Sequence, residues 1–406
     1  MAYDETTFRR TEEPTTDPAA YRANTLAAAD QRRRAEEMET ADTAAVDVRE
    51  DDGRDRLGIH LGWEVVLLLA AGAFGFLLWQ LDKNAFQRPA LDNLLITGAA
   101  VGLLTLGAGL TLRAGVPNLA LGPIALGASL HYAEQGDLGL LKAGIPALII
   151  AAAGAVAVGL LILVLHVPGW VATLAAALGV IVYDQLRVAP EVVQGRYDPT
   201  DQAFFLFGGF ALLAVLGAAL GTVTPVRRWL GGMRSSGDQA RRRGFAVALP
   251  VIGTLVLSSV FAVGAGFLIA AQSAGPIVPG TGLEWTGIAV GLALLAGTSA
   301  YGRRGGMFGT LFAVAAFTLY LDWSTRKNLE ISLFATAAAV LAAGLIVTRL
   351  VESFGRPLLP AHGDEWNAAP TTAAQNWTPD LESWTPATTT AARTDRWDDG
   401  PWGSSR

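Results

Sequence analysis

Few side chains in this sequence could bind a metal ion or act as a catalytic base, and their spacing supports neither chemistry. The four histidines, His60, His131, His166 and His362, are far apart, and no His-Glu-x-x-His pattern or calcium-binding loop occurs. The chain has no cysteine, which excludes a thiolate nucleophile, a disulfide and a cysteine-bound metal. We therefore expect that the protein is not an enzyme and that it holds no metal ion and no cofactor.

The sequence also lacks the means to bind a nucleotide or a nucleic acid. No G-x-x-x-x-G-K-[ST] loop is present to cradle the phosphates of ATP. The net charge of −6 gives no support for a nucleic-acid partner, and we expect none. If ATP drives this protein, a separate subunit must bind and hydrolyse it.

The elements that position the remaining polar residues are long apolar segments. Apolar residues make up 51% of the chain, charged residues 16%, and the mean hydropathy is +0.37, as in multi-span membrane proteins. A helix needs about 20 mostly apolar residues to cross a bilayer. The segments that meet this measure predict an all-α, polytopic membrane helix bundle with about ten transmembrane helices. They are residues 61–81, 93–112, 115–132, 144–166, 169–186, 203–224, 245–271, 284–300, 307–323 and 330–349.

The third and the eighth of these spans are predicted to be broken. The third begins Gly115-Val-Pro-Asn-Leu-Ala-Leu-Gly-Pro123, and the eighth follows Gly280-Thr-Gly-Leu-Glu284. Glycine and proline interrupt helices, and interrupted helices occur at membrane depth only where protein or a water-filled cavity satisfies the freed backbone groups.

Acidic residues lie near the ends of the predicted spans. They are Glu64, Asp184, Glu284, Asp322 and Glu330. Ion-coupled carriers normally place such groups deep within a span, so this distribution argues against a carrier driven by protons or sodium.

Arginine and lysine predict the orientation of the chain. The connection between residues 224 and 243 holds six arginines against one acidic residue, Asp238, and should be cytoplasmic. Counting spans from it places both termini in the cytoplasm and makes the chain a multi-pass plasma-membrane protein. The connection with Arg326 and Lys327 is an exception, because it would be external.

Three regions are predicted from the change in composition along the chain. Residues 1–58 form an acidic cytoplasmic tail and residues 351–406 a tail rich in Thr, Pro and Trp, both disordered. Residues 59–350 form the transmembrane domain. The five tryptophans of the second tail could anchor a partner or the membrane surface.

Three stretches of the transmembrane domain carry a family resemblance. Gly115–Gly122 is similar to G-x-x-[ND]-[LF]-[SA]-x-G, Pro168–Leu174 is a proline-led segment ending in Val-Ala-Thr-Leu, and Gly280–Ala289 is similar to G-x-G-x-E-x-x-A-I-A. In order and spacing, about residues 62–350 resemble the permease subunits of ABC importers for ribose-type sugars and branched-chain amino acids. The pair Thr298-Ser299 favours the sugar branch, whereas Ala296 replaces a usual glycine.

The resemblance implies a ten-span subunit that works as a dimer, with a second copy or a paralogue, in the lipid bilayer. Its other partners would be a cytoplasmic P-loop ATPase subunit and an extracytoplasmic solute-binding protein. The solute would be small and polar, with a sugar favoured. The expected translocation pathway contains Gly115, Asn118, Gly122, Gly282, Glu284, Thr298 and Ser299.

The same resemblance implies an ATPase-coupling helix in the arginine-rich connection, although its triple arginine is unusual for the family. The residues concerned are Gly237, Asp238, Gln239, Ala240, Arg241, Arg242, Arg243 and Gly244. A basic loop held inside by its charge is the other interpretation of this segment.

Two other functions fit the same span count. A secondary, ion-coupled solute transporter would need a coupling site and no ATPase. A non-transporting scaffold would depend on the tryptophan-bearing tail at residues 360–406.

Overall fold

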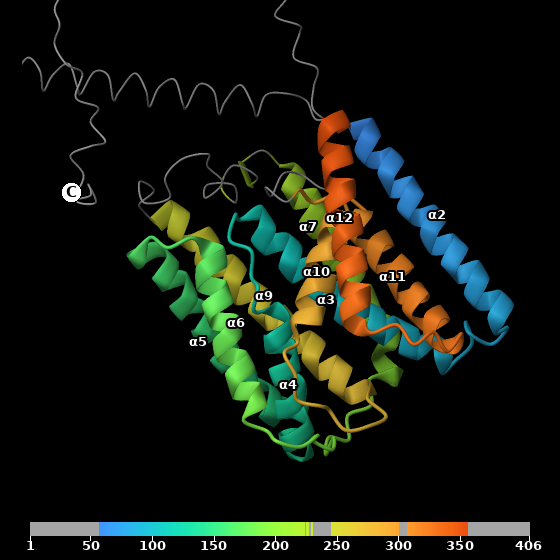
Figure 1. Cartoon of the computed structure of the whole chain (residues 1–406), viewed down its shortest axis with the longest axis horizontal. Coiled ribbons are helices and arrows are strands. Elements are labelled where there is room, and N and C mark those ends of the chain that lie inside the picture. The colour runs from blue at the N-terminus through green and yellow to red at the C-terminus, as the bar shows by residue number, and fades with distance from the viewer. Residues whose placement is uncertain (1–56, 224, 227–228, 230–244, 300–306, 356–406) are drawn as a thin grey trace, which may run out of the picture. The chain divides into compact units, whose positions relative to one another are not determined.

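The structure, a computed structural model, describes residues 57–223, 225–226, 229, 245–299 and 307–355 (Figure 1). Within these ranges the regular secondary structure is helical, and an isolated bridge between Glu191 and Ile277 is the nearest approach to a strand. This confirms the predicted all-α class for the part described. Most of the two predicted tails lies outside these ranges.

The helices follow the apolar segments of the sequence, which end at glycine, proline or clustered polar residues. They are α2 (Leu57–Leu81), α3 (Ala90–Arg113), α4 (Leu121–Gln135), α5 (Leu140–Leu165), α6 (Gly169–Gln185), α7 (Ala203–Thr222), α9 (Phe245–Gln272), α10 (Leu283–Leu295), α11 (Gly309–Arg326) and α12 (Leu333–Gly355). Two short 3₁₀ helices, η1 (Gly136–Leu138) and η2 (Thr200–Gln202), lie in connections.

In the part of the chain that the structure describes, six helical segments are long and apolar enough to cross a membrane, so the chain is a helical membrane protein. They are Ile59–Leu81, Ala90–Arg113, Leu140–Leu165, Thr200–Thr222, Ala248–Gln272 and Leu333–Val351. Helices α6 and α10 are apolar but shorter. The count of about ten crossings stays a prediction.

Helices α3 and α9 form the centre of the bundle. The apolar window of α3 is 61% buried inside the protein and that of α9 is 56%, against 17% for those of α5 and α7. Helix α3 packs against α9, α7, α10 and α11, and α9 packs against α3, α4 and α5. Figure 1 shows α2 and α12 at one edge of this arrangement and α5 and α6 at the opposite edge.

Small residues allow these helices to approach closely. A Cβ added at Gly266 of α9 would lie 2.1 Å from the carbonyl oxygen of Ala125 on α4, and one at Gly344 of α12 would lie 2.5 Å from that of Gly291 on α10. Inside a bilayer, where water does not drive helices together, such close backbone contact supplies much of the packing energy.

Both predicted interruptions are present in the structure. Helix α4 begins only at Leu121, after a non-helical segment at residues 114–120, and has 15 residues. Helix α10 has 13 residues and follows a non-helical segment at residues 273–282. At a rise of about 1.5 Å per residue, each is shorter than the hydrocarbon core of a bilayer.

Candidate functional site

The two short helices begin side by side, at Gly122 of α4 and Gly282 before α10. A Cβ at Gly122 would lie 2.0 Å from the carbonyl oxygen of Gly282, and a Cβ at Gly282 would lie 2.6 Å from that of Gly122. Gly282 also has a φ of +66°, which favours glycine. From this contact, called here the α4–α10 crossing, α4 and α10 extend toward opposite ends of the bundle (Figure 1).

Thr286, in the first turn of α10, joins the two helices at the crossing. Its hydroxyl accepts a hydrogen bond from the backbone N–H of Gly122 at 2.9 Å and donates one to the carbonyl oxygen of Leu119 at 3.1 Å. These two groups belong to the interrupted start of α4 and would otherwise be costly to bury. Thr286 was not among the predicted pathway residues, although it lies within the Gly280–Ala289 stretch.

The start of α4 depends on a sharp turn at the end of α3. The N–H groups of Ala114, Gly115 and Val116 donate to the carbonyl oxygens of Leu110, Leu112 and Thr111, and Gly115 has a φ of +75°. This is the left-handed glycine termination common at helix ends. Gly115 therefore reverses the chain and sends the following residues back along α3.

Asn118 holds the interrupted segment in place. Its side-chain oxygen accepts the N–H of Ala120 at 3.0 Å, and its amide nitrogen donates to the hydroxyl of Ser258 on α9 at 2.8 Å. Asn118 is 4% exposed, so this side chain is occupied by the protein itself. The structure assigns it a positioning role at the crossing, and Ser258 is a partner that sequence reasoning missed.

Glu284 lies in the first turn of α10, at the crossing. It is half-buried, and its Oε2 atom is buried with no hydrogen-bond partner. A carboxylate at this position is favoured by the partial positive charge of a helix N-terminus. Among the predicted pathway residues, Glu284 is therefore the one that combines charge with partial access.

Thr298 and Ser299 lie at the other end of α10, which is about 20 Å long. Gly297, with a φ of +91°, ends α10 with the same three-bond pattern as Gly115 ends α3. Both polar residues are buried, and Thr348 of α12 donates to the carbonyl oxygen of Thr298 at 3.5 Å. The structure thus separates this pair from Asn118, Gly122 and Gly282, which lie together.

Helices α2 and α11 meet the end of α10 close to Thr298. The indole N–H of Trp63 donates to the carbonyl oxygen of Leu295 at 2.7 Å. The carboxylate of Glu64 accepts the N–H groups of Phe308 and Gly309 at 2.7 and 3.2 Å, at the first turn of α11. Glu64 lies near the start of its helix, as predicted, but it serves as a helix cap.

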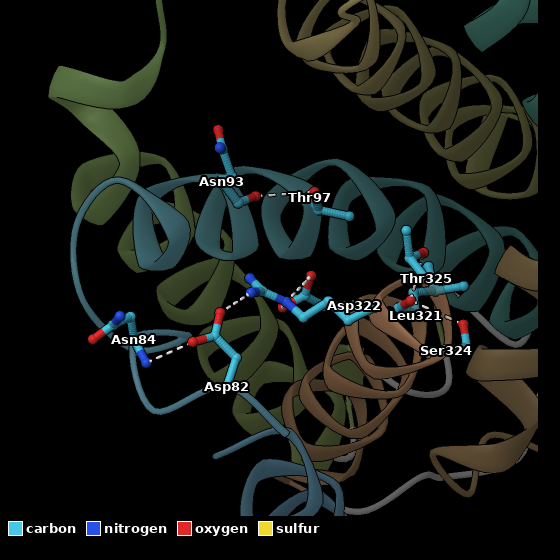
Figure 2. A network of polar contacts seen from close by, with 9 residues as sticks. Asp82, Asn84, Asn93, Thr97, Leu321, Asp322, Ser324 and Thr325 are labelled. Atoms are coloured by element: carbon cyan, nitrogen blue, oxygen red, sulfur yellow. Dashed lines mark hydrogen bonds and ion pairs between the residues drawn. The ribbon is translucent and has the colours of Figure 1, made fainter. Parts of the chain in front are cut away.

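Ion pairs hold the opposite end of the bundle together. Arg326 bonds Asp322 on its own helix and also Asp82, which follows α2 (Figure 2). Hydrogen bonding to Asp322, together with the charge of Asp82, raises the pKa of Arg326. Nearby, Gln272 of α9 accepts from the hydroxyl of Thr97 on α3 at 3.1 Å. These contacts join α2 to α11 and α3 to α9 at this end.

One part of the predicted site cannot be placed. The ATPase-coupling residues Gly237–Gly244 lie outside the described residues. In the described part of the chain, no three His, Asp or Glu side chains are grouped so as to hold a metal ion.

Comparison of the chain with models of known protein families, with curated proteins and with solved structures finds no match. The family resemblance therefore depends on the three sequence stretches, two of which form the α4–α10 crossing.

Proposed function

We propose that this protein is the membrane-spanning permease subunit of an ATP-binding-cassette importer and that it translocates a small polar solute, a sugar in the first instance. The observation that carries this proposal is the α4–α10 crossing, where two half-length helices begin against each other inside an apolar bundle. Discontinuous helices that meet within the bundle are a recurring way to build a solute path in membrane transporters.

The chemistry of the crossing suits a path that binds solute weakly. The side chains of Thr286 and Asn118 bond three backbone groups of the interrupted segment, at Leu119, Ala120 and Gly122, so these groups need no ligand as a partner. The residues that meet there include two glycines, Gly122 and Gly282, and the short polar side chain of Thr286, with Glu284 as the charged group. Such a path leaves selectivity to a separate receptor, in keeping with the proposed extracytoplasmic solute-binding protein.

The proposed assembly has two permease subunits and cytoplasmic ATPase subunits in the plasma membrane, with both termini of this chain in the cytoplasm. The chain has no phosphate-binding loop, so ATP must be hydrolysed by the partner. The segment Gly237–Gly244 would transmit closure of the ATPase to the bundle as a rigid-body movement.

A secondary, ion-coupled transporter is the other candidate, and one observation favours it. Asp184 is fully buried and both of its carboxylate oxygens lack a hydrogen-bond partner. Buried carboxyls of this kind often bind the coupling ion in carriers. The two functions differ in their need for an ATPase.

Purification of the tagged chain from its native membrane in a mild detergent tests the proposal. We expect a P-loop ATPase to co-elute in a fixed ratio, to hydrolyse ATP, and to be lost when Arg241, Arg242 and Arg243 are all changed to Glu. Changing Arg196, Lys327 and Arg349 to Glu is the matched control and should leave the complex intact. Monodisperse protein without an ATPase would contradict the proposal and favour the secondary transporter.

A further inference from the structure

Asp184, the second-last residue of α6, has a buried carboxyl that is not part of the α4–α10 crossing. The residue is 0% exposed, and neither Oδ1 nor Oδ2 has a hydrogen-bond partner. A Cβ at Gly127 of α4 would lie 2.7 Å from Oδ1, so the carboxyl lies against the α4 backbone. A carboxylate ion buried without a partner is strongly unfavourable.

The nearest opposite charge, Arg187, is engaged elsewhere. Its Nη2 atom donates to Oε2 of Glu134 at 2.8 Å and its Nε atom to Oε1, a two-point pair. Its guanidinium also lies 4.7 Å from the ring centre of Tyr183. Hydrogen bonding between the two groups raises the pKa of Arg187 and holds that of Glu134 below its usual range.

The other titratable groups on the packed elements do not replace Arg187. His131 on α4 interacts electrostatically with Glu134. Arg187 is the charged group that interacts electrostatically with Asp184. Tyr132, also on α4, lies against Gly195 and the ring of Phe267. On α5 the titratable side chain is that of Lys142, which is exposed.

We propose that Asp184 is a proton-binding site, in which the carboxyl carries a proton at neutral pH and releases it when Arg187 moves to it from Glu134. The two carboxylates differ in access to water. The side chain of Glu134 is 29% exposed and can be hydrated when Arg187 leaves, whereas Asp184 has no access to solvent. The exchange releases one proton to water and lowers the charge of the cluster by one.

The proton would affect the α4–α10 crossing through α4. Asp184 touches α4 at Gly127, five residues after Gly122. A charge on this carboxyl would therefore change the packing of the helix that begins at the crossing. This inference does not depend on an ATPase, and it holds for either proposed transport mechanism.

Infrared difference spectroscopy, which compares the purified full-length protein at neutral and at alkaline pH, tests the inference. At neutral pH we expect the carbonyl band of a protonated carboxylic acid, and we expect ¹³C labelling of aspartate carboxyls to move it. The labelling needs no substitution, so its result remains valid even if a variant fails to fold. Absence of a protonated aspartate band at neutral pH would overturn the proposal.

Two variants assign the band to a residue. Asp184→Asn should abolish the band, whereas Asp137→Asn, at an exposed site, should retain it. Glu134→Gln removes the carboxylate that holds Arg187 and should therefore move the loss of the band to lower pH. In the wild type the band should disappear at alkaline pH, and Arg187→Gln should move that loss to higher pH because it removes the cation that would stabilise the carboxylate. A band that survives Asp184→Asn in folded protein would contradict the assignment.

Discussion

At the scale of single residues, Glu64 joins two helices that are far apart in the sequence. It is 4% exposed, and its carboxylate accepts two N–H groups at the start of α11. Those groups have no partner within their own helix, and the negative charge matches the partial positive charge of the helix N-terminus.

Glu64→Ala should therefore destabilise the protein by about 1.5–3 kcal/mol, the usual contribution of a hydrogen bond to a charged group. Glu64→Gln keeps an acceptor and should lose less. Thermal unfolding in detergent, followed by tryptophan fluorescence, measures both. Glu330→Ala, at an exposed site, is the control. Equal effects of Glu64→Ala and Glu330→Ala would rule out the capping role.

The sequence identified polar residues at this scale but not their partners. Asn118 stood out as a polar residue within a glycine- and proline-rich segment, yet its partner Ser258 is 140 residues away and lies in an ordinary apolar run. Asp184 lies near a helix end, as predicted, but only tertiary packing against Gly127 shows that it is buried. Distance from a helix end is therefore a poor guide to burial.

At the scale of elements, the interruptions of α4 and α10 were predictable because glycine and proline break helices locally. That the two broken helices meet was not predictable from either segment alone. It depends on α3 packing against both α9 and α10, which brings together residues about 160 positions apart. The termination of α3 and α10 by Ala-Gly in the same geometry is a local feature that the sequence does carry.

The crossing makes a prediction for Gly122. In Gly122→Ala the new methyl group would lie 2.0 Å from the carbonyl oxygen of Gly282 and 2.6 Å from the backbone nitrogen of Thr286. Overpacking of this kind costs about 1–3 kcal/mol or more. We expect a clear loss of folded protein in fluorescence-detected size-exclusion chromatography after heating.

Gly72→Ala on α2 is the matched substitution, because nothing lies within 4 Å of the added Cβ. It should leave stability unchanged or slightly higher, since alanine favours a helix over glycine. If Gly122→Ala proves as stable as Gly72→Ala, the close contact between α4 and α10 is wrong.

At the scale of the whole molecule, composition was enough to predict a helical membrane protein, and the six long apolar helices among the described residues agree with this prediction. The number of crossings was harder to predict, because a half-length helix and a full span have the same composition. Helix α10 shows this, since its 13 residues are as apolar as a span and too few to cross alone.

We propose that the α4–α10 crossing borders a solute path that opens and closes with ATP. The chain has no cysteine, so a single cysteine can report on one position. Glu284→Cys, in the purified complex, should react with a water-soluble maleimide in one nucleotide state and be protected in the other. Gly154→Cys, on an exposed face of α5 in the bundle, is the membrane-facing control and should react in neither state. The account is contradicted if Glu284→Cys stays unreactive in every nucleotide state while a cysteine in place of exposed Asp137 reacts freely.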